Sequence, residues 1–330
     1  MEELNWSRTT VLITGGTGSF GRKCASVLLN EKQPRRLIIF SRDEQKQHDM
    51  KQLFPEGNNS PVRYFIGDVR DRSRLSRAFH DVDVVIHAAA MKQVPACEYN
   101  PFEAVQTNII GAENVIDAAI DSGVKRVVAV STDKAVNPVN LYGATKLVAE
   151  KLFVHGNAYA GGRGTRFACT RYGNVVGSRG SVVPLFQRQR SDGRITLTDP
   201  AMTRFWISLD RGIRFVIKCL EIMKGGEIFV PKIPSMSLAD LADAVATDCG
   251  REIIGVRPGE KMHEVLISPD EARHGVEYED MYVIYPASPW QSSGGLNGGK
   301  PLARDFCYSS DTNEQWLRGE QVRGLLADAL

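Results

Sequence analysis

The sequence predicts an α/β protein that has a doubly wound parallel sheet and a second, smaller α/β lobe. Two observations predict the sheet. Short runs of β-branched and apolar residues alternate with amphipathic stretches through the first half of the chain, and a glycine-rich turn directly follows the first of these runs. Near-continuous apolar strands are typical of a sheet that helices cover on both faces. After Arg171 the rhythm gives way to segments rich in glycine, proline and arginine, which indicates the second lobe.

The expected elements follow in chain order. Strands are predicted at 11–14, 37–40, 62–66, 82–88, 126–131 and 165–170. The stretch 202–220 predicts a further strand followed by a long helix, and 237–250 predicts a short helix. From Ser292 the chain is predicted to be a loop or linker. We therefore expect a first domain at 1–177, joined by 202–230, and a second lobe at 178–330.

Composition excludes several classes of protein. With 330 residues, of which 42% are hydrophobic, the chain can build one large core or two coupled ones. The 41 basic and 39 acidic residues are scattered together, so we expect no nucleic-acid partner. Six dispersed cysteines without a CxxC pair argue against a disulfide framework and a zinc knuckle. An acidic N-terminus and the lack of a long apolar run predict a soluble, cytoplasmic protein without a membrane partner.

The glycine-rich turn after the first strand predicts a dinucleotide site. Gly15, Gly18 and Gly21 have the spacing G-x-x-G-x-x-G in front of a predicted helix. Glycines let the backbone approach a pyrophosphate, and the amide groups and dipole of the helix meet its charge. The first domain is therefore predicted to be a Rossmann domain, although a plain glycine-rich turn would also produce this pattern.

The end of the second predicted strand favours NADP. Ser41 and Arg42 stand where NAD-selective enzymes usually offer a carboxylate to the adenosine ribose, and a guanidinium suits a 2′-phosphate. Asp43 and Glu44, which follow, are explained as a helix N-cap and a first-turn residue. Asp68, after the third strand, is either a ligand of the adenine amine or a turn aspartate.

The segment after the fifth predicted strand contains candidate catalytic residues. Tyr142 and Lys146 are four residues apart and share one face of a helix. A lysine ammonium, together with the positive charge of a nicotinamide, can lower the pKa of a tyrosine from about 10 and make it a base. Asp133 and Lys134 place an acid and a base side by side, an arrangement that a surface ion pair would also explain.

Five motifs together resemble the inverting UDP-N-acetylglucosamine 4,6-dehydratases of nonulosonic acid biosynthesis, of the pseudaminic acid type, in the extended short-chain dehydrogenase/reductase superfamily. The resemblance runs from about Thr10 to Pro286. Retaining dehydratases of the same group typically carry methionine where Tyr142 stands, and the dTDP-glucose type usually has Thr-Asp-Glu in place of Thr-Asp-Lys. The motifs are GGTGSFG, HAAAMKQVPACEYNP, STDKAVNPVNLYGATK, RYGNVVGSRGSVVP and RPGEKMHE.

The resemblance implies a reaction. Tyr142, with Thr132 and Lys146, would take the proton of the sugar O4 while a hydride leaves C4 for NADP. Lys134 would then remove the C5 proton, and Asp133 would protonate the departing C6 hydroxyl. The hydride returns to C6 and a proton to the opposite face of C5. The expected product is UDP-2-acetamido-2,6-dideoxy-L-arabino-hexos-4-ulose, which makes the enzyme a hydro-lyase.

The resemblance also implies binding residues, and it makes 178–330 the lobe that binds the sugar nucleotide. No metal is expected, because His87 and His263 lack further ligands at zinc spacing. The expected substrate ligands are Lys92, Asn174, Arg179, Arg257 and Glu260. The expected cofactor ligands are Gly15, Thr17, Gly18, Ser19, Phe20, Gly21, Ser41, Arg42, Asp68, Val69, Ala88, Ala89, Ala90, Lys92, Tyr142 and Lys146.

Two other functions fit the same scaffold. One is a retaining 4,6-dehydratase or a 4-epimerase of a nucleotide amino sugar; the epimerase would share Tyr142 and Lys146 but would not need the pair Asp133 and Lys134. A silent NADP-binding protein would need none of the catalytic residues. The family resemblance implies a homo-oligomer, a dimer or a hexamer. The choice between UDP and GDP, the downstream acid and the role of the chain after about residue 286 stay open.

Overall fold

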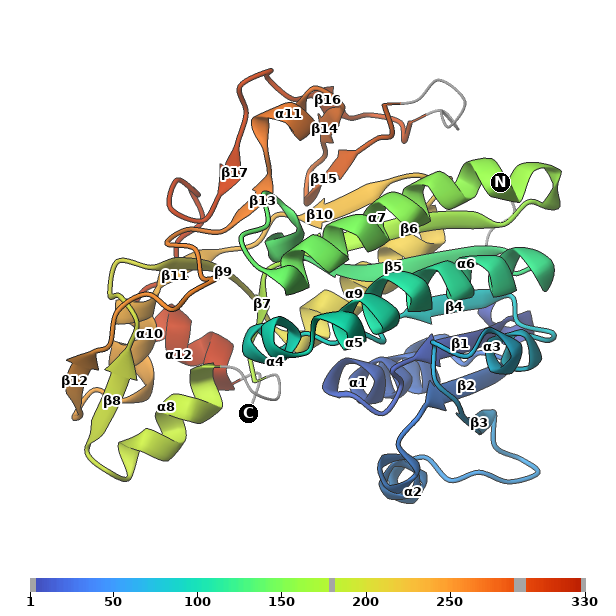
Figure 1. The fold of residues 1–330 in the computed structure, drawn as a ribbon, viewed down its shortest axis with the longest axis horizontal. Helices are drawn as coiled ribbons and strands as arrows, with labels where there is room; N and C mark the ends of the chain where they lie inside the picture. The colour runs from blue at the N-terminus through green and yellow to red at the C-terminus, as the bar shows by residue number, and fades with distance from the viewer. Residues whose placement is uncertain (1–3, 178–181, 288–294, 328–330) are drawn as a thin grey trace.

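The fold is built around one large, mostly parallel sheet (Figure 1). The computed structural model describes residues 4–177, 182–287 and 295–327. Within these ranges the main sheet has ten strands. In spatial order they are β16 (Lys300–Pro301), β14 (Gly275–Glu277), β15 (Met281–Ile284), β10 (Ile228–Pro231), β6 (Arg166–Tyr172), β5 (Arg126–Thr132), β4 (Val84–His87), β1 (Thr10–Thr14), β2 (Arg36–Ser41) and β3 (Val62–Ile66).

The strands from β10 to β3 pair in parallel, and β14, β15 and β16 extend the sheet with antiparallel pairs. Every residue of β1 and β4 is buried, because helices cover both faces of the sheet. The predicted doubly wound α/β fold is thereby confirmed. The strand order reverses between β1 and β4, and ligands of such sheets bind at the carboxyl ends of the strands there.

Helices pack on both faces. On one face α6 contacts both α3 and α7. On the other face α9 contacts α1 and packs against β5 and β6. The helices are α1 (Ser19–Val27), α2 (Glu44–Leu53), α3 (Arg72–Ala78), α4 (Val94–Tyr99), α5 (Pro101–Val105), α6 (Gly111–Asp121), α7 (Leu141–Ala160), α8 (Val182–Arg190), α9 (Leu209–Ile222), α10 (Leu238–Val245), α11 (Pro269–Ala272) and α12 (Glu320–Ala327). No helix in the described part of the chain is long and apolar enough to cross a membrane.

A second buried cluster lies beside the main core, around Trp206 and Phe186. It joins α8, α10 and α12, at the left of Figure 1. The smaller sheets of the described residues are β11 (Ser235–Ser237) with β9 (Thr203–Ile207) and β7 (Asn174–Val175), β12 (Gly250–Ile253) with β8 (Arg194–Leu197), and β13 (Val265–Ile267) with β17 (Tyr308–Ser309).

Several parts of the second half differ in detail from the sequence prediction. The helix expected at 237–250 ends at Val245, and the Thr247 hydroxyl takes the Asp243 carbonyl that a longer helix would have used. The predicted loop from Ser292 begins outside the described residues, and further on Lys300–Pro301 forms β16. The division of the chain near residue 178 stays a prediction. Strands β14, β15 and β16, which follow that boundary, lie in the main sheet.

Candidate active site

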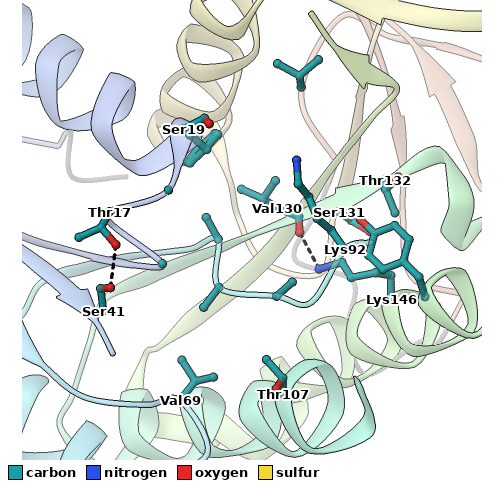
Figure 2. Close-up of a pocket in the computed structure, with 18 of the residues that line it drawn as sticks. Thr17, Ser19, Ser41, Val69, Lys92, Thr107, Val130, Ser131, Thr132 and Lys146 are labelled. Carbon is teal, nitrogen blue, oxygen red and sulfur yellow. Dashed lines mark hydrogen bonds between the residues drawn. The ribbon is translucent and has the colours of Figure 1, made fainter. Parts of the chain in front are cut away.

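A cavity of about 640 Å³ opens at the carboxyl ends of β1, β2, β4 and β5. Figure 2 shows its two ends: Thr17 and Ser41 lie at one, and Lys92, Thr132 and Lys146 gather at the other. The side-chain hydroxyls of Thr107 and Ser131 in its lining are buried and have no hydrogen-bond partner among the described residues. Unpaired buried hydroxyls in a cavity indicate that a polar ligand satisfies them.

The turn between β1 and α1 fits a pyrophosphate. Gly15 has a φ of +66°, and a Cβ at this position would lie 2.9 Å from the backbone nitrogen of Ala89. A Cβ at Gly21 would collide with the carbonyl of Gly16, so the third glycine serves the close packing of the turn on α1. No side chain caps α1 at Gly18, which leaves the first-turn amides of the helix directed at the cavity.

The end of β2 provides further polar groups at the same end of the cavity as the β1–α1 turn. Thr17 and Ser41 share a hydrogen bond of 2.7 Å between their hydroxyls. The Arg42 side chain is 60% exposed, and its Nη1 lies 3.6 Å from Asp68 Oδ2. Asp68 is also held by the Arg70 guanidinium at 2.7 Å, so its carboxylate is already engaged. Asp43 caps α2 by accepting from the Lys46 amide at 3.0 Å, in agreement with the N-cap explanation.

The catalytic candidates lie where β5 ends and α7 begins. Asn140 caps α7 by accepting from the Gly143 amide, which starts the helix just before Tyr142. One turn later the Lys146 ammonium donates to the Val130 carbonyl at 2.8 Å, as the dashed line in Figure 2 shows. Tyr142 and Lys146 both line the cavity, so the helix presents them on one face as predicted from their spacing.

Burial sets the charge state of this helix face. It raises the pKa of Tyr142 to about 12, although the Lys134 ammonium opposes the shift. It also lowers the pKa of Lys146. With protein groups alone, Tyr142 is therefore a neutral phenol at pH 7 and needs a further positive charge to act as a base.

Asp133 and Lys134 follow β5 in a short 3-10 turn, η4 (Asp133–Ala135). The Lys134 ammonium donates to Asp133 Oδ1 at 3.2 Å, and the Thr132 hydroxyl donates to the same oxygen at 2.9 Å. Asp133 is completely buried, and burial together with the Glu264 carboxylate raises the pKa of Asp133 above its usual range. A carboxyl whose pKa is raised can hold a proton and donate it, as a general acid must.

The protein groups alone do not make Lys134 a base. A base would need a lowered pKa, and burial does lower it, but the Asp133 and Glu264 carboxylates raise the pKa of Lys134 overall. Lys134 Nζ is 3.2 Å from Glu264 Oε1. Glu264 was not among the predicted site residues. Its signal was present, because it ends the motif RPGEKMHE from which only Arg257 and Glu260 were selected.

The structure brings most of the predicted site residues together. Asp133 is buried and does not line the cavity, and neither does Gly21; Arg179 lies outside the described residues. Arg257 and Glu260 do not line the cavity; they pair with each other at 3.9 Å in a turn whose Gly259 carbonyl accepts from Asn140. The predicted residues that line the cavity are Gly15, Thr17, Gly18, Ser19, Phe20, Ser41, Arg42, Asp68, Val69, Ala88, Ala89, Ala90, Lys92, Thr132, Lys134, Tyr142, Lys146 and Asn174.

The two histidines have structural partners. His87 Nδ1 hydrogen-bonds Thr14 at 2.8 Å, and burial lowers the pKa of His87 to about 3. His263 Nδ1 hydrogen-bonds Thr203 at 2.9 Å. No group of three or more His, Cys, Asp or Glu side chains in the described ranges could hold a metal ion.

Comparisons with known proteins agree with the family resemblance that the five sequence motifs indicate. The model of the family described as "Polysaccharide biosynthesis protein" matches residues 11–286. A UDP-N-acetylglucosamine 4,6-dehydratase (inverting) of Campylobacter jejuni subsp. jejuni serotype O:2 is 54% identical over 96% of this chain and 97% of its own length. A UDP-glucose 4-epimerase of Rickettsia canadensis is 44% identical over 83% of this chain and 82% of its own length.

Solved structures extend the agreement to the fold. The X-ray structure of Pen from Bacillus thuringiensis superimposes with a TM-score of 0.90 at 41% identity, over 98% of this chain and 99% of that one. The dTDP-glucose 4,6-dehydratase DesIV from Streptomyces venezuelae, 23% identical, shares the fold with a TM-score of 0.66 over 77% of this chain and 87% of its own. The chain belongs to the polysaccharide biosynthesis protein family of extended short-chain dehydrogenases/reductases, and the predicted resemblance to inverting UDP-N-acetylglucosamine 4,6-dehydratases is confirmed.

Proposed function

We propose that the chain is an NADP-dependent UDP-N-acetylglucosamine 4,6-dehydratase that inverts C5 and catalyses the first step of pseudaminic acid biosynthesis. One observation carries the proposal: a buried carboxyl, Asp133, whose pKa is raised, lies 3.2 Å from an amine, Lys134, that lines the same cavity as Tyr142. Elimination of water from a sugar needs such an acid and base together. The Campylobacter relatives, more than half identical over nearly the whole chain, support this substrate and stereochemistry.

The cofactor is held by the β1–α1 turn and by the ends of β2 and β4. Gly15 and Gly18 bring the backbone to the pyrophosphate, and Ala88 to Ala90 provide a wall of small side chains against which a flat ring can lie. Ser41 and Arg42 meet the 2′-phosphate of NADP. A bound nicotinamide would supply the hydride acceptor that the sugar C4 needs and the hydride donor that C6 needs.

The residues of this chain manage the protons. Tyr142 takes the proton of O4, and Lys146, anchored on the Val130 carbonyl, adds positive charge beside the bound ring. A proton that moves from Lys134 Nζ to Asp133 Oδ1, 3.2 Å away, leaves a neutral amine and a neutral carboxyl. The amine then removes the C5 proton, and the carboxyl protonates the C6 hydroxyl as water leaves.

The remaining assignments belong to the same proposal. Lys92 and Asn174 line the cavity beside Lys134 and bind the sugar or phosphate. Arg179, Arg257 and Glu260 complete the nucleotide diphosphate grip when substrate is present. The domain to residue 177, joined by 202–230, binds NADP, and the lobe from 178 binds the sugar nucleotide. We place the enzyme in the cytoplasm, a reducing compartment that agrees with six unpaired cysteines. We also propose that it is a homo-oligomer.

A 4-epimerase is the second candidate, because a Rickettsia UDP-glucose 4-epimerase is 44% identical over 83% of the chain. Epimerisation would need Tyr142, Lys146 and a dinucleotide that takes the C4 hydride and returns it to the opposite face of C4, and it gives Asp133 and Lys134 no task. Asp133 is buried and pairs with Lys134, which lines the cavity, and this arrangement favours the dehydratase.

Turnover in D2O distinguishes these functions. We expect purified enzyme, incubated with UDP-N-acetylglucosamine, to form a 4-keto-6-deoxy sugar of L-configuration that carries deuterium at C5, as followed by proton NMR. Lys134→Ala should remove this activity while NADP binding, measured by fluorescence, stays within about twofold. A simple C4 epimer would support the second candidate, retention at C5 would support a retaining dehydratase, and no turnover would contradict the proposal.

A further inference from the structure

Glu264 is a buried carboxylate that contacts the catalytic pair from another part of the chain. It directly precedes β13, and its side chain is only 3% exposed. Its amide donates to the Ser310 hydroxyl at 2.9 Å, and its carbonyl accepts from the Ser310 amide at 2.8 Å. The backbone of Glu264 is thus held on both sides, so the carboxylate is directed at Lys134 without relying on the catalytic residues.

Three cations face this carboxylate. Lys134 Nζ is 3.2 Å from Oε1, Arg204 Nε is 3.9 Å from Oε1, and Lys261 Nζ is 3.7 Å from Oε2. Burial raises the pKa of Glu264, but these three charges lower it below the usual range, so Glu264 is ionised. The charged and titratable groups of the whole cluster are Asp133 and Lys134 on η4, Tyr142 on α7, Arg204 on β9, and Lys261 with Glu264 before β13.

Two carboxylate oxygens of this cluster have no hydrogen-bond donor among the residues that the structure describes. Neither Asp133 Oδ2 nor Glu264 Oε2 accepts a hydrogen bond within the described part of the chain. Two buried carboxylates that share one lysine cannot both be ionised at low cost, and the better-paired one keeps the charge. Glu264 faces three cations, whereas the partners of the Asp133 side chain among the described residues are Lys134 and Thr132. The extra proton therefore goes to Asp133.

We propose that Glu264 is a positioning residue for the dehydration: its carboxylate holds the Lys134 amine toward the cavity, and its negative charge keeps the proton of the general acid on Asp133. The inference rests on the proposed function and adds the third member of its acid and base pair. In this arrangement Glu264 takes and gives no proton itself. One proton passes between Lys134 and Asp133, and no other reactant is required.

The pH profile of turnover tests this role. The charge of Glu264 favours protonation of both Lys134 and Asp133, so Glu264→Gln should move both limbs of the kcat profile to lower pH, by about one unit. Glu264→Asp, which keeps the charge, should leave both limbs nearly in place. Lys261→Gln removes a neighbouring positive charge, so its limbs should move to higher pH by a smaller amount.

Glu227→Gln is the matched control. Glu227 is a buried carboxylate directly before β10 that accepts from the amides of Lys224 and Gly225, and it does not line the cavity. Removal of its charge should change thermal stability but not the position of either limb. A Glu264→Gln profile that falls in height with both limbs unmoved would show a purely structural role and overturn the proposal.

A titration without substrate separates this inference from the proposed function. Aspartate labelled with ¹³C at Cγ reports the Asp133 carboxyl, with its resonance identified by loss in Asp133→Asn. We expect the midpoint for Asp133 to fall by about one unit in Glu264→Gln and to stay in place in Glu227→Gln. An unchanged midpoint would refute the inference even if dehydration is demonstrated, and a shifted midpoint would support it even if turnover of this substrate fails.

Discussion

In our proposal, Arg42 is the residue on which cofactor choice depends. Its side chain is 60% exposed at the end of β2 and approaches Asp68 to only 3.6 Å, while Arg70 holds Asp68 at 2.7 Å. Arg42 can therefore turn to a phosphate without leaving Asp68 unpaired. Beside it, the Ser41 hydroxyl is already oriented by Thr17. These contacts are the reason why we propose a 2′-phosphate, rather than the two hydroxyls of an NAD ribose, as the ligand at this end.

Arg42→Asp should change this preference. Loss of a charged hydrogen bond to phosphate, with a carboxylate in its place, should weaken NADP binding by about tenfold or more and affect NAD much less. Fluorescence titration with the two dinucleotides measures both affinities. Arg77→Asp, on the exposed side of α3 and outside the cavity lining, is the control. Equal affinities of the native protein for NAD and NADP would contradict the assignment.

At the scale of elements, the turn between β1 and α1 can lie close to the backbone that follows β4, because Gly15 has no side chain at the point where the two approach each other. The backbone of β4 runs on past Gly15 so closely that a Cβ there would meet Ala89 at 2.9 Å. The φ of +66° adds a conformational reason for glycine. Both the positive φ and the lack of space for a Cβ therefore require glycine at position 15.

A matched variant separates the effect of Gly15→Ala from ordinary glycine strain. Gly123 has a φ of +70°, but a Cβ added there would meet nothing within 4 Å, so Gly123→Ala measures the conformational cost alone, about 1 kcal/mol. Gly15→Ala should cost more in thermal and urea unfolding and should weaken dinucleotide binding, whereas Gly123→Ala should leave binding unchanged. Equal effects of the two substitutions would mean that close approach at Gly15 is unimportant.

At the scale of the whole molecule, a buried ion cluster ties three parts of the chain together. Arg171 on β6 has a fully buried side chain, and its guanidinium pairs with Glu150 of α7 at 2.6 Å and with Glu271 of α11 at 2.8 Å. It also donates to the Leu266 carbonyl in β13. The helix that carries Tyr142 and the segment that carries Glu264 are therefore fixed to the same strand.

Arg171→Met should destabilise the fold by about 3–5 kcal/mol at pH 7, because the buried Glu150 and the partly buried Glu271 both lose their partner. Burial raises the pKa of Glu271, but Arg171 lowers it overall, so the pairing stabilises the fold above the unfolded pKa of about 4.3. This contribution is lost as the pH falls through the lowered folded pKa. The stability gap between native and Arg171→Met protein should therefore narrow in acid.

Urea unfolding between pH 3 and pH 8 measures the gap. Arg214→Met is the control, since Arg214 also bridges two carboxylates, Glu31 and Asp210, but at the surface, where ion pairs contribute little. A gap that stays constant with pH would show that packing rather than charge accounts for the role of Arg171.

The sequence alone was enough for the parts of the molecule that depend on neighbours along the chain. The alternation of strands and helices, the glycine turn and the shared face of Tyr142 and Lys146 are all local patterns, because strand and helix periodicity and capping act over a few residues. They located the cavity and most of its lining.

Only the tertiary structure decided how segments far apart in the chain meet. It placed Glu264 beside Lys134, added the strands β14, β15 and β16 to the main sheet, and buried Arg171 between two glutamates. It also decided the direction of the Lys134 pKa, which two carboxylates raise against the effect of burial. Charge interactions depend on distance and on exclusion of water, and neither exists until the chain has folded.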